Sequence, residues 1–167
     1  MRSDAERMYL NTGDDALFWR SSDAPAGVYR SVAPAPPLAD FVARIHFGHE
    51  WVPPEAPVVE RVLPDGGVHL IFDLGDAPAQ PEGGTAYASE VVGARCTPAV
   101  IRMAGRMEHV SARLEPGGME ALLGVPAAEL AETSVSLDAL WGSRADEARE
   151  RLAAAPRGPA RAAVLEA

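Results

Sequence analysis

The sequence predicts an α+β fold, in which an antiparallel β-barrel or β-sandwich is followed by several short C-terminal helices. Three observations predict it. Between residues 58 and 114, apolar and polar residues alternate as in β-strands, and glycines and prolines separate the runs. After Gly118, the apolar residues recur at the spacing of an α-helix. The 167 residues, 47% hydrophobic and 23% charged, suit one globular domain.

Two hairpins are predicted in the β part. Residues 58–63 and 68–74 alternate on either side of Asp65-Gly66-Gly67, where glycine supplies the positive φ of a tight turn. Residues 99–104 and 107–114 alternate in the same way around Gly105. Further strands are expected at residues 45–52 and 88–92, and a short helical turn at residues 38–42.

A series of short helices is expected after Gly118. Gly124 is placed to end the first of them, whose apolar face is formed by Met119, Leu122 and Leu123. The later helices are predicted to start at Pro126, at Ser136 and Ser143 as N-caps, and at Pro159.

Charge and cysteine content restrict the class of protein. The chain has 15 basic and 24 acidic residues, a net charge of −9, which is a poor match to a surface that binds DNA phosphates. Its single cysteine, Cys96, has no intramolecular partner, and no signal peptide is recognised, so we expect a cytoplasmic protein. The apolar runs are too short to span a membrane.

Four segments carry a resemblance to a known family by their order and spacing. They are residues 37–42 (Pro-Leu-Ala-Asp-Phe-Val), 60–66 (Glu-Arg-Val-Leu-Pro-Asp-Gly), 92–95 (Val-Gly-Ala-Arg) and 114–141. The chain from about Tyr29 to Leu165 resembles the N-terminal sensor half of AraC-type transcriptional regulators. The resemblance implies a cupin-like β-barrel, a helical linker and a C-terminal pair of helix-turn-helix units that bind DNA. Those units are not in this sequence.

The resemblance divides the chain into an N-terminal arm (1–27), a cupin-like barrel (28–118) and a helical linker or dimerisation segment (119–167). It implies a non-catalytic domain that senses a small-molecule effector, forms a homodimer, or does both. DNA would be bound only through the absent region, and no cofactor is expected. Two alternatives stay open, namely a cupin-type metalloenzyme and a protein-interaction module without a pocket.

Candidate ligand-binding residues come from the predicted strands. Small-molecule sites combine apolar walls with a few polar groups, and an inward arginine suits an anionic effector. The candidates are Trp51, Arg61, His69, Phe72 and Arg102, and each also has a plain structural interpretation in the core or on the surface. His109 has the same two interpretations as His69.

The alanine-rich helix from Ser143 to Ala155 is a candidate subunit interface, through Ala145, Ala148 and Leu152. Packing of this helix on the barrel is an equally good interpretation.

Metal-ligand residue types crowd together only at residues 46–50, His-Phe-Gly-His-Glu. In a strand, side chains three residues apart point to opposite faces. His46 and His49 are therefore not expected to share a metal ion, and we predict no metal site.

Overall fold

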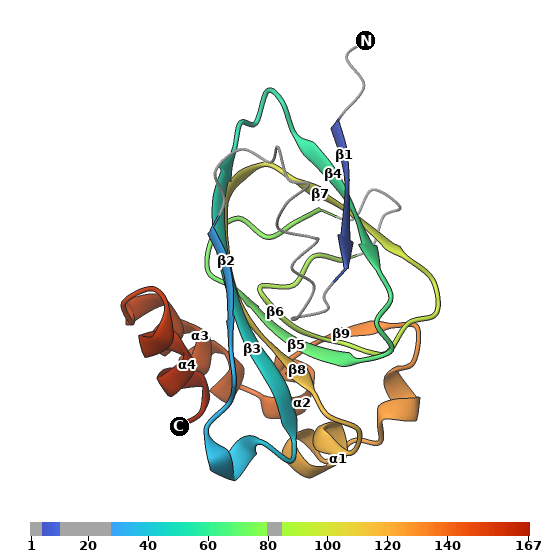
Figure 1. Ribbon diagram of the computed structural model, residues 1–167, viewed down its shortest axis with the longest axis vertical. Helices are drawn as coiled ribbons and strands as arrows, with labels where there is room; N and C mark the ends of the chain where they lie inside the picture. Colours follow the sequence, from blue (N-terminus) through green and yellow to red (C-terminus); the bar gives the residue numbers. More distant parts are fainter. Residues whose placement is uncertain (1–4, 11–27, 80–84) are drawn as a thin grey trace.

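The computed structural model describes residues 5–10, 28–79 and 85–167 (Figure 1). Its strands form two sheets. The smaller sheet has three strands in the order β1-β4-β7, and the larger has six in the order β2-β3-β8-β5-β6-β9. The strands are β1 (Ala5–Leu10), β2 (Val28–Val32), β3 (Val42–Val52), β4 (Val58–Leu63), β5 (Val68–Asp73), β6 (Ser89–Val92), β7 (Ala99–Met103), β8 (Gly105–Leu114) and β9 (Ser134–Ser136).

The helices are short and, apart from the first turn, follow the last long strand. They are η2 (Pro36–Leu38), α1 (Gly118–Leu123), η3 (Ala127–Leu130), α2 (Asp138–Trp141), α3 (Arg144–Ala154) and α4 (Pro159–Leu165). The structure therefore confirms an α+β fold with mainly antiparallel sheets, although β1 pairs with β4 in parallel. Among the described residues the two sheets do not close into a barrel.

Both predicted hairpins are wrong. β4 pairs with β1 and β7, whereas β5 pairs with β6 and β8. β7 and β8 likewise belong to different sheets. Asp65-Gly66-Gly67 and Gly105 do make the turns that their chemistry predicts, with positive φ at Gly66 and Gly105. Each turn carries the chain from one sheet to the other, because strand pairing is decided by residues far away in the sequence.

The long pair β3–β8 runs from one sheet toward the other. Val52 lies opposite Gly105 at its end, and beyond the bend Val58 lies opposite Met103 in the pair β4–β7. Val52, Met103 and Met107 form a small apolar cluster at this bend, with Val58 and Ile101 packed against it. The strands β3 and β4, paired with β8 and β7, thus form one bent antiparallel ribbon that joins the two sheets.

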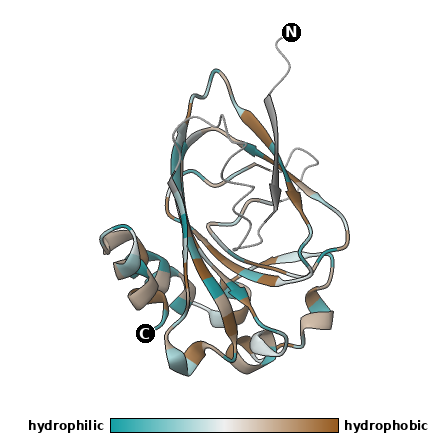
Figure 2. Ribbon diagram, in the orientation of Figure 1, coloured by the Kyte–Doolittle hydropathy of each residue, from teal (hydrophilic) through white to brown (hydrophobic). Residues whose placement is uncertain are grey.

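The helices cover one face of the six-stranded sheet, and the three-stranded sheet lies on its other side (Figure 1). Bands of hydrophobic and hydrophilic residues alternate along the strands of the six-stranded sheet (Figure 2). The main core forms where the apolar side chains of β3, β5 and β8 meet those of α1 to α4. Phe72, Leu137 and Leu152 are fully buried there. Burial of each such side chain contributes roughly 1.5–3 kcal/mol to folding.

The predicted start and stop signals of the helices are confirmed in part. Gly124 follows α1 with a φ of 71°, as a terminating glycine should. Ser136 and Ser143 do not cap helices through their side chains. Ser136 instead belongs to β9, a strand that the sequence analysis did not predict, and its hydroxyl donates to the Asp138 carboxylate.

β1 lies within the segment that was predicted to be an N-terminal arm. The rest of that arm, residues 1–4 and 11–27, lies outside the described residues. Within the described part of the chain, no helix is both long enough and apolar enough to cross a membrane.

Candidate functional site: a buried polar sheet face

The six-stranded sheet has two faces of opposite character. Residues paired in register on neighbouring strands share a face. Ile45, Ala112 and Leu70 lie side by side on the face that packs against the helices. One residue further along each strand, His46, Ser111 and Ile71 lie side by side on the opposite face. We call this second face the polar face.

The polar face consists of three rows that cross the strands. The register of the strands brings together, in each row, residues that are far apart in the sequence. The rows are Ser31, His46, Ser111, Ile71 and Glu90; Tyr29, Gly48, His109 and Asp73; and Arg113 with His69, adjoining Arg44 on β3.

On the polar face, the Tyr29 ring of the edge strand β2 lies close to two imidazoles. Its centroid is 5.6 Å from that of His46, in a stacked arrangement, and 6.0 Å from that of His109. Gly48 makes room for this cluster, since a Cβ atom at this position would lie 2.7 Å from His109 Cε1 and 3.3 Å from Tyr29 Cδ2. The cluster therefore depends on a residue without a side chain in the middle of β3.

His46 is fully buried, and neither of its ring nitrogens has a hydrogen-bond partner among the described residues. A neutral imidazole carries one donor and one acceptor, and each buried polar atom left unpaired costs about 1–3 kcal/mol. Burial, followed by the charges of His69 and His109 and of nearby arginines, lowers the pKa of His46 to about 4. Burial also lowers the pKa of His109 to about 4. Both imidazoles are therefore neutral at pH 7.

Asp65 fixes one end of the polar face. Its carboxylate accepts a hydrogen bond from Arg113 Nε at 2.7 Å, contacts His69 Nε2 at 3.1 Å and accepts the Gly67 N–H at 2.9 Å. Burial alone raises the pKa of Asp65, but the hydrogen bonds from His69 and Arg113 outweigh it and hold the pKa well below its usual range. The turn at Asp65 thus holds the side chains of Arg113 and His69 in place.

Two carboxyl groups lie toward the other edge of the polar face. Burial, followed by the charge of the neighbouring Glu90, raises the pKa of Asp73 to about 7. Burial also raises the pKa of Glu90 to about 7. Glu90 Oε2 is buried, and no described residue forms a hydrogen bond with it. The polar face therefore holds hydrogen-bonding groups near neutral charge that the described residues do not satisfy.

The polar face contains one of the five predicted ligand-binding residues, His69. Trp51 lies near the end of β3 with 62% of its surface exposed. Phe72 is fully buried on the opposite face, in the core against the helices. Arg61 and Arg102 belong to the three-stranded sheet, half-buried and exposed respectively. The structure does not bring these four residues together with His69.

Sequence reasoning missed Tyr29, Asp73 and Glu90 as site residues, and it considered His46 only as a metal ligand. A period of two places His46 and His49 on opposite faces, as predicted, and His49 lies opposite Glu108 on β8. Within the described residues, no group of three or more histidine, cysteine or acidic side chains is arranged to hold a metal ion.

The predicted subunit-interface residues lie on α3. Ala145 and Leu152 are buried in the core of the chain itself, and Ala148 packs against it. This placement corresponds to the packing interpretation of the helix. A role in assembly stays a prediction that their burial does not support.

A salt-bridge cluster on the helix-side face joins β8 to the C-terminal helices. Glu108 is buried and accepts hydrogen bonds from Arg157 Nε and Arg161 Nη1, both at 2.7 Å, and from Arg106 Nη1 at 3.1 Å. The hydrogen bond from Arg157, and then the one from Arg161, lower the pKa of Glu108 to about 2. Glu108 directly precedes His109, so β8 carries a residue that holds the C-terminal helices next to a residue of the polar face.

Comparison with known proteins identifies the family of the chain but assigns no activity to it. Residues 30–136 match the model of the DUF6597 family, described as a domain of unknown function, and the chain belongs to this family. The match covers most of both sheets and ends at β9. No curated protein and no solved structure matches the chain.

Proposed function

We propose that this chain is a non-catalytic, effector-sensing domain of an AraC-type transcriptional regulator, with a cupin-like β-fold and a helical linker. The observation that carries the proposal is the fully buried His46, whose two ring nitrogens find no partner within residues 5–10, 28–79 and 85–167. Unpaired buried polar groups are costly in a stable fold, and such departures from the rules of folding are expected at functional or strained sites.

The chemistry of the polar face suits a small neutral or weakly acidic organic molecule. His46 offers one donor and one acceptor, and Glu90 a further unsatisfied oxygen. The Tyr29 ring beside His46 and His109 provides an aromatic surface. Arg113 does not call for an anionic ligand at its end of the polar face, because the Asp65 carboxylate already balances its charge.

The same strand offers a route from ligand to helices. A ligand that displaces His109 acts on the backbone of β8 next to Glu108. Glu108 in turn holds Arg157, just before α4, and Arg161, in the first turn of α4. In a regulator of this type, the helical segment would pass the signal to the DNA-binding half and carry the homodimer contacts.

The proposal is tested with a chimera in which the chain is joined, after Ala167, to the helix-turn-helix units of an AraC-type regulator that lacks its own sensor half. We expect transcription from a reporter promoter to depend on the fused chain and to respond to an extract of bacterial metabolites. His46→Leu should abolish the response. His49→Leu, on the same strand but the other face, is the matched control and should keep it.

The proposal fails if the folded chimera behaves like the helix-turn-helix units alone. It also fails if native mass spectrometry of the purified chain shows one tightly bound transition metal per chain, since that result would favour the metalloenzyme alternative.

A further inference from the structure

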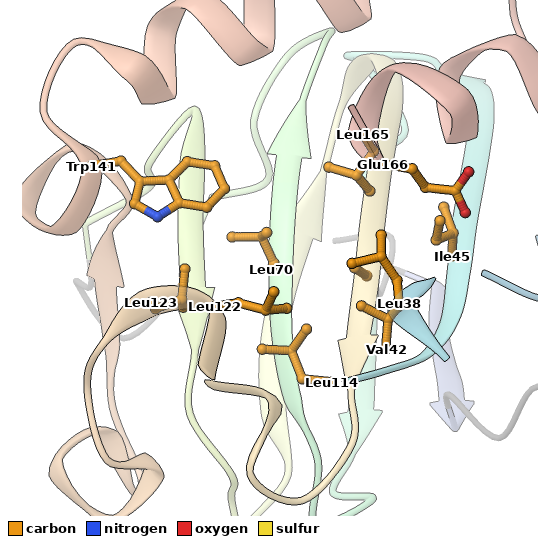
Figure 3. Close-up of a pocket in the computed structure, with 11 residues that line it drawn as sticks. Leu38, Val42, Ile45, Leu70, Leu114, Leu122, Leu123, Trp141, Leu165 and Glu166 are labelled. Atoms are coloured by element: carbon orange, nitrogen blue, oxygen red, sulfur yellow. The ribbon is translucent and has the colours of Figure 1, made fainter. Parts of the chain in front are cut away.

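A second candidate site lies on the other face of the six-stranded sheet, between the sheet and the helices. Here a pocket of about 190 Å³ opens between β3, β5 and β8 on one side and η2, α1, α2 and the end of α4 on the other. In Figure 3, Trp141 lies on one side of this pocket and Leu165 and Glu166 on the other, with Leu70 and Leu114 between them.

The floor of the pocket is hollow because of one small side chain. Ala112 lies in register between Ile45 and Leu70, so a methyl group stands between two large aliphatic side chains. The helix side is formed by leucines of α1 and by Trp141 of α2. The pocket therefore exists only when the helical segment is docked on the sheet.

Ten of its eleven lining residues are apolar, and Glu166 is the exception. The Glu166 carboxylate is held in place by the Ala35 N–H, which donates to Oε1 at 2.6 Å. A fixed carboxylate beside an apolar cavity repels an anion but not a neutral molecule.

We propose that this pocket binds an uncharged, apolar molecule of about one aromatic ring. The size argument rests on volume, because an apolar protein cavity of about 150 Å³ is sufficient to bind benzene. The aromatic face of Trp141 and the aliphatic walls provide the dispersion contacts that such a ring requires. This site is separate from the polar face, and the proposal does not depend on the effector-sensing function.

The probes are toluene, which is neutral, and benzoate, which has the same ring with a negative charge. A ligand that binds only the folded state raises the melting temperature. We expect millimolar toluene to raise the melting temperature of the chain, and benzoate at the same concentration to leave it unchanged. His46→Leu should respond to toluene as the wild type does.

Ala112→Leu fills the floor of the pocket and should weaken toluene binding at least tenfold. Ala121→Leu makes the same change at an exposed position of α1 and is the matched control, with unchanged binding. Methyl NMR of the wild type gives a second readout that needs no variant. Toluene should shift the methyl signals of Leu70, Leu114 and Leu123, which line the pocket, and leave those of Leu63, which does not line it, unchanged.

The proposal is overturned if toluene does not bind, if benzoate binds equally well, or if the shifted methyl groups lie elsewhere. It is also overturned if folded Ala112→Leu binds toluene with wild-type affinity.

Discussion

The two faces of the six-stranded sheet differ in how they treat buried polar groups. On the helix-side face, Glu108 is buried, but three arginines donate hydrogen bonds to it. On the polar face, His46 is equally buried, and the part of the chain that the structure describes gives it no hydrogen-bond partner. Both residues lie on adjacent central strands of one sheet. The helix-side face thus matches its buried charge, whereas the polar face leaves a buried polar group unmatched by the described residues, at a cost in stability.

Removal of the Glu108 charge should cause the largest change in stability. Glu108→Gln leaves Arg161 buried opposite an uncharged partner, and breaking a buried ion pair from one side is strongly destabilising. We expect a loss of roughly 3 kcal/mol in the free energy of unfolding at pH 7, measured by urea denaturation.

This effect depends on pH in a defined direction. The pKa of Glu108 is lowered to about 2 in the folded state, so its contribution is present above its ordinary pKa and is lost as the pH falls toward 2. The difference between wild type and Glu108→Gln should be constant above pH 5 and shrink below it. A difference that stays constant down to pH 3 would contradict the ion-pair explanation.

Asp73 on the polar face should show the opposite behaviour. Its folded pKa is raised to about 7, so its contribution to the free energy of unfolding is present below its ordinary pKa and is lost as the pH rises through 7. Asp73→Asn has no carboxyl group to ionise, so the variant does not lose stability in this way. We expect the variant to be more stable than the wild type by roughly 1–3 kcal/mol at pH 8, with the advantage vanishing near pH 4. Thermal unfolding at several pH values measures it, and an equal advantage at every pH would disprove the buried-charge account.

Gly48 tests how tightly the aromatic cluster is built. In Gly48→Ala, the new Cβ would lie too close to His109 Cε1, so the imidazole and the Tyr29 ring must move. We expect a loss of about 1–2 kcal/mol and shifted imidazole NMR signals for both His46 and His109. Gly67→Ala meets only the end of the Arg113 side chain and serves as the comparison. Unshifted imidazole signals in folded Gly48→Ala would be the contrary result.

The smallest expected effect is also the most informative about the polar face. His46→Leu replaces an unsatisfied buried imidazole by an apolar side chain, which removes the desolvation cost of two unpaired nitrogens. We expect the free energy of unfolding to change by less than about 1 kcal/mol, in either direction. A loss of several kcal/mol in urea denaturation would show that His46 is a structural core residue.

Local sequence patterns predicted much of the secondary structure. The alternation around residues 45–52, 68–74 and 107–114 and the glycine after residue 123 all correspond to observed elements. Pairing was not predictable, because Asp65-Gly66-Gly67 makes the same local turn whether the next strand returns along β4 or crosses to the other sheet. Turn chemistry is decided locally, whereas sheet membership is decided by the long-range partners β8 and β7.

The candidate site was predicted poorly for the same reason. His69 was identified because it alternates within its own strand. Tyr29 and His46 meet only through the pairing of β2 with β3, and His109 joins them only through β8. Burial of Asp73 and Glu90, which raises their pKa values, likewise depends on strands that the sequence does not place.

The pairing of β3 with β8 also has a consequence for how the chain reaches its native state. These two strands form the longest ladder of the fold, yet β4, β5, β6 and β7 all lie between them in the sequence. The chain must therefore close a long loop before its central ladder is stabilised, which slows folding to the millisecond-to-second range typical of such topologies. Until β8 arrives, the apolar residues of β3 offer an open strand edge to other chains. Dilute, slow refolding should therefore recover more monodisperse protein than rapid refolding at high concentration.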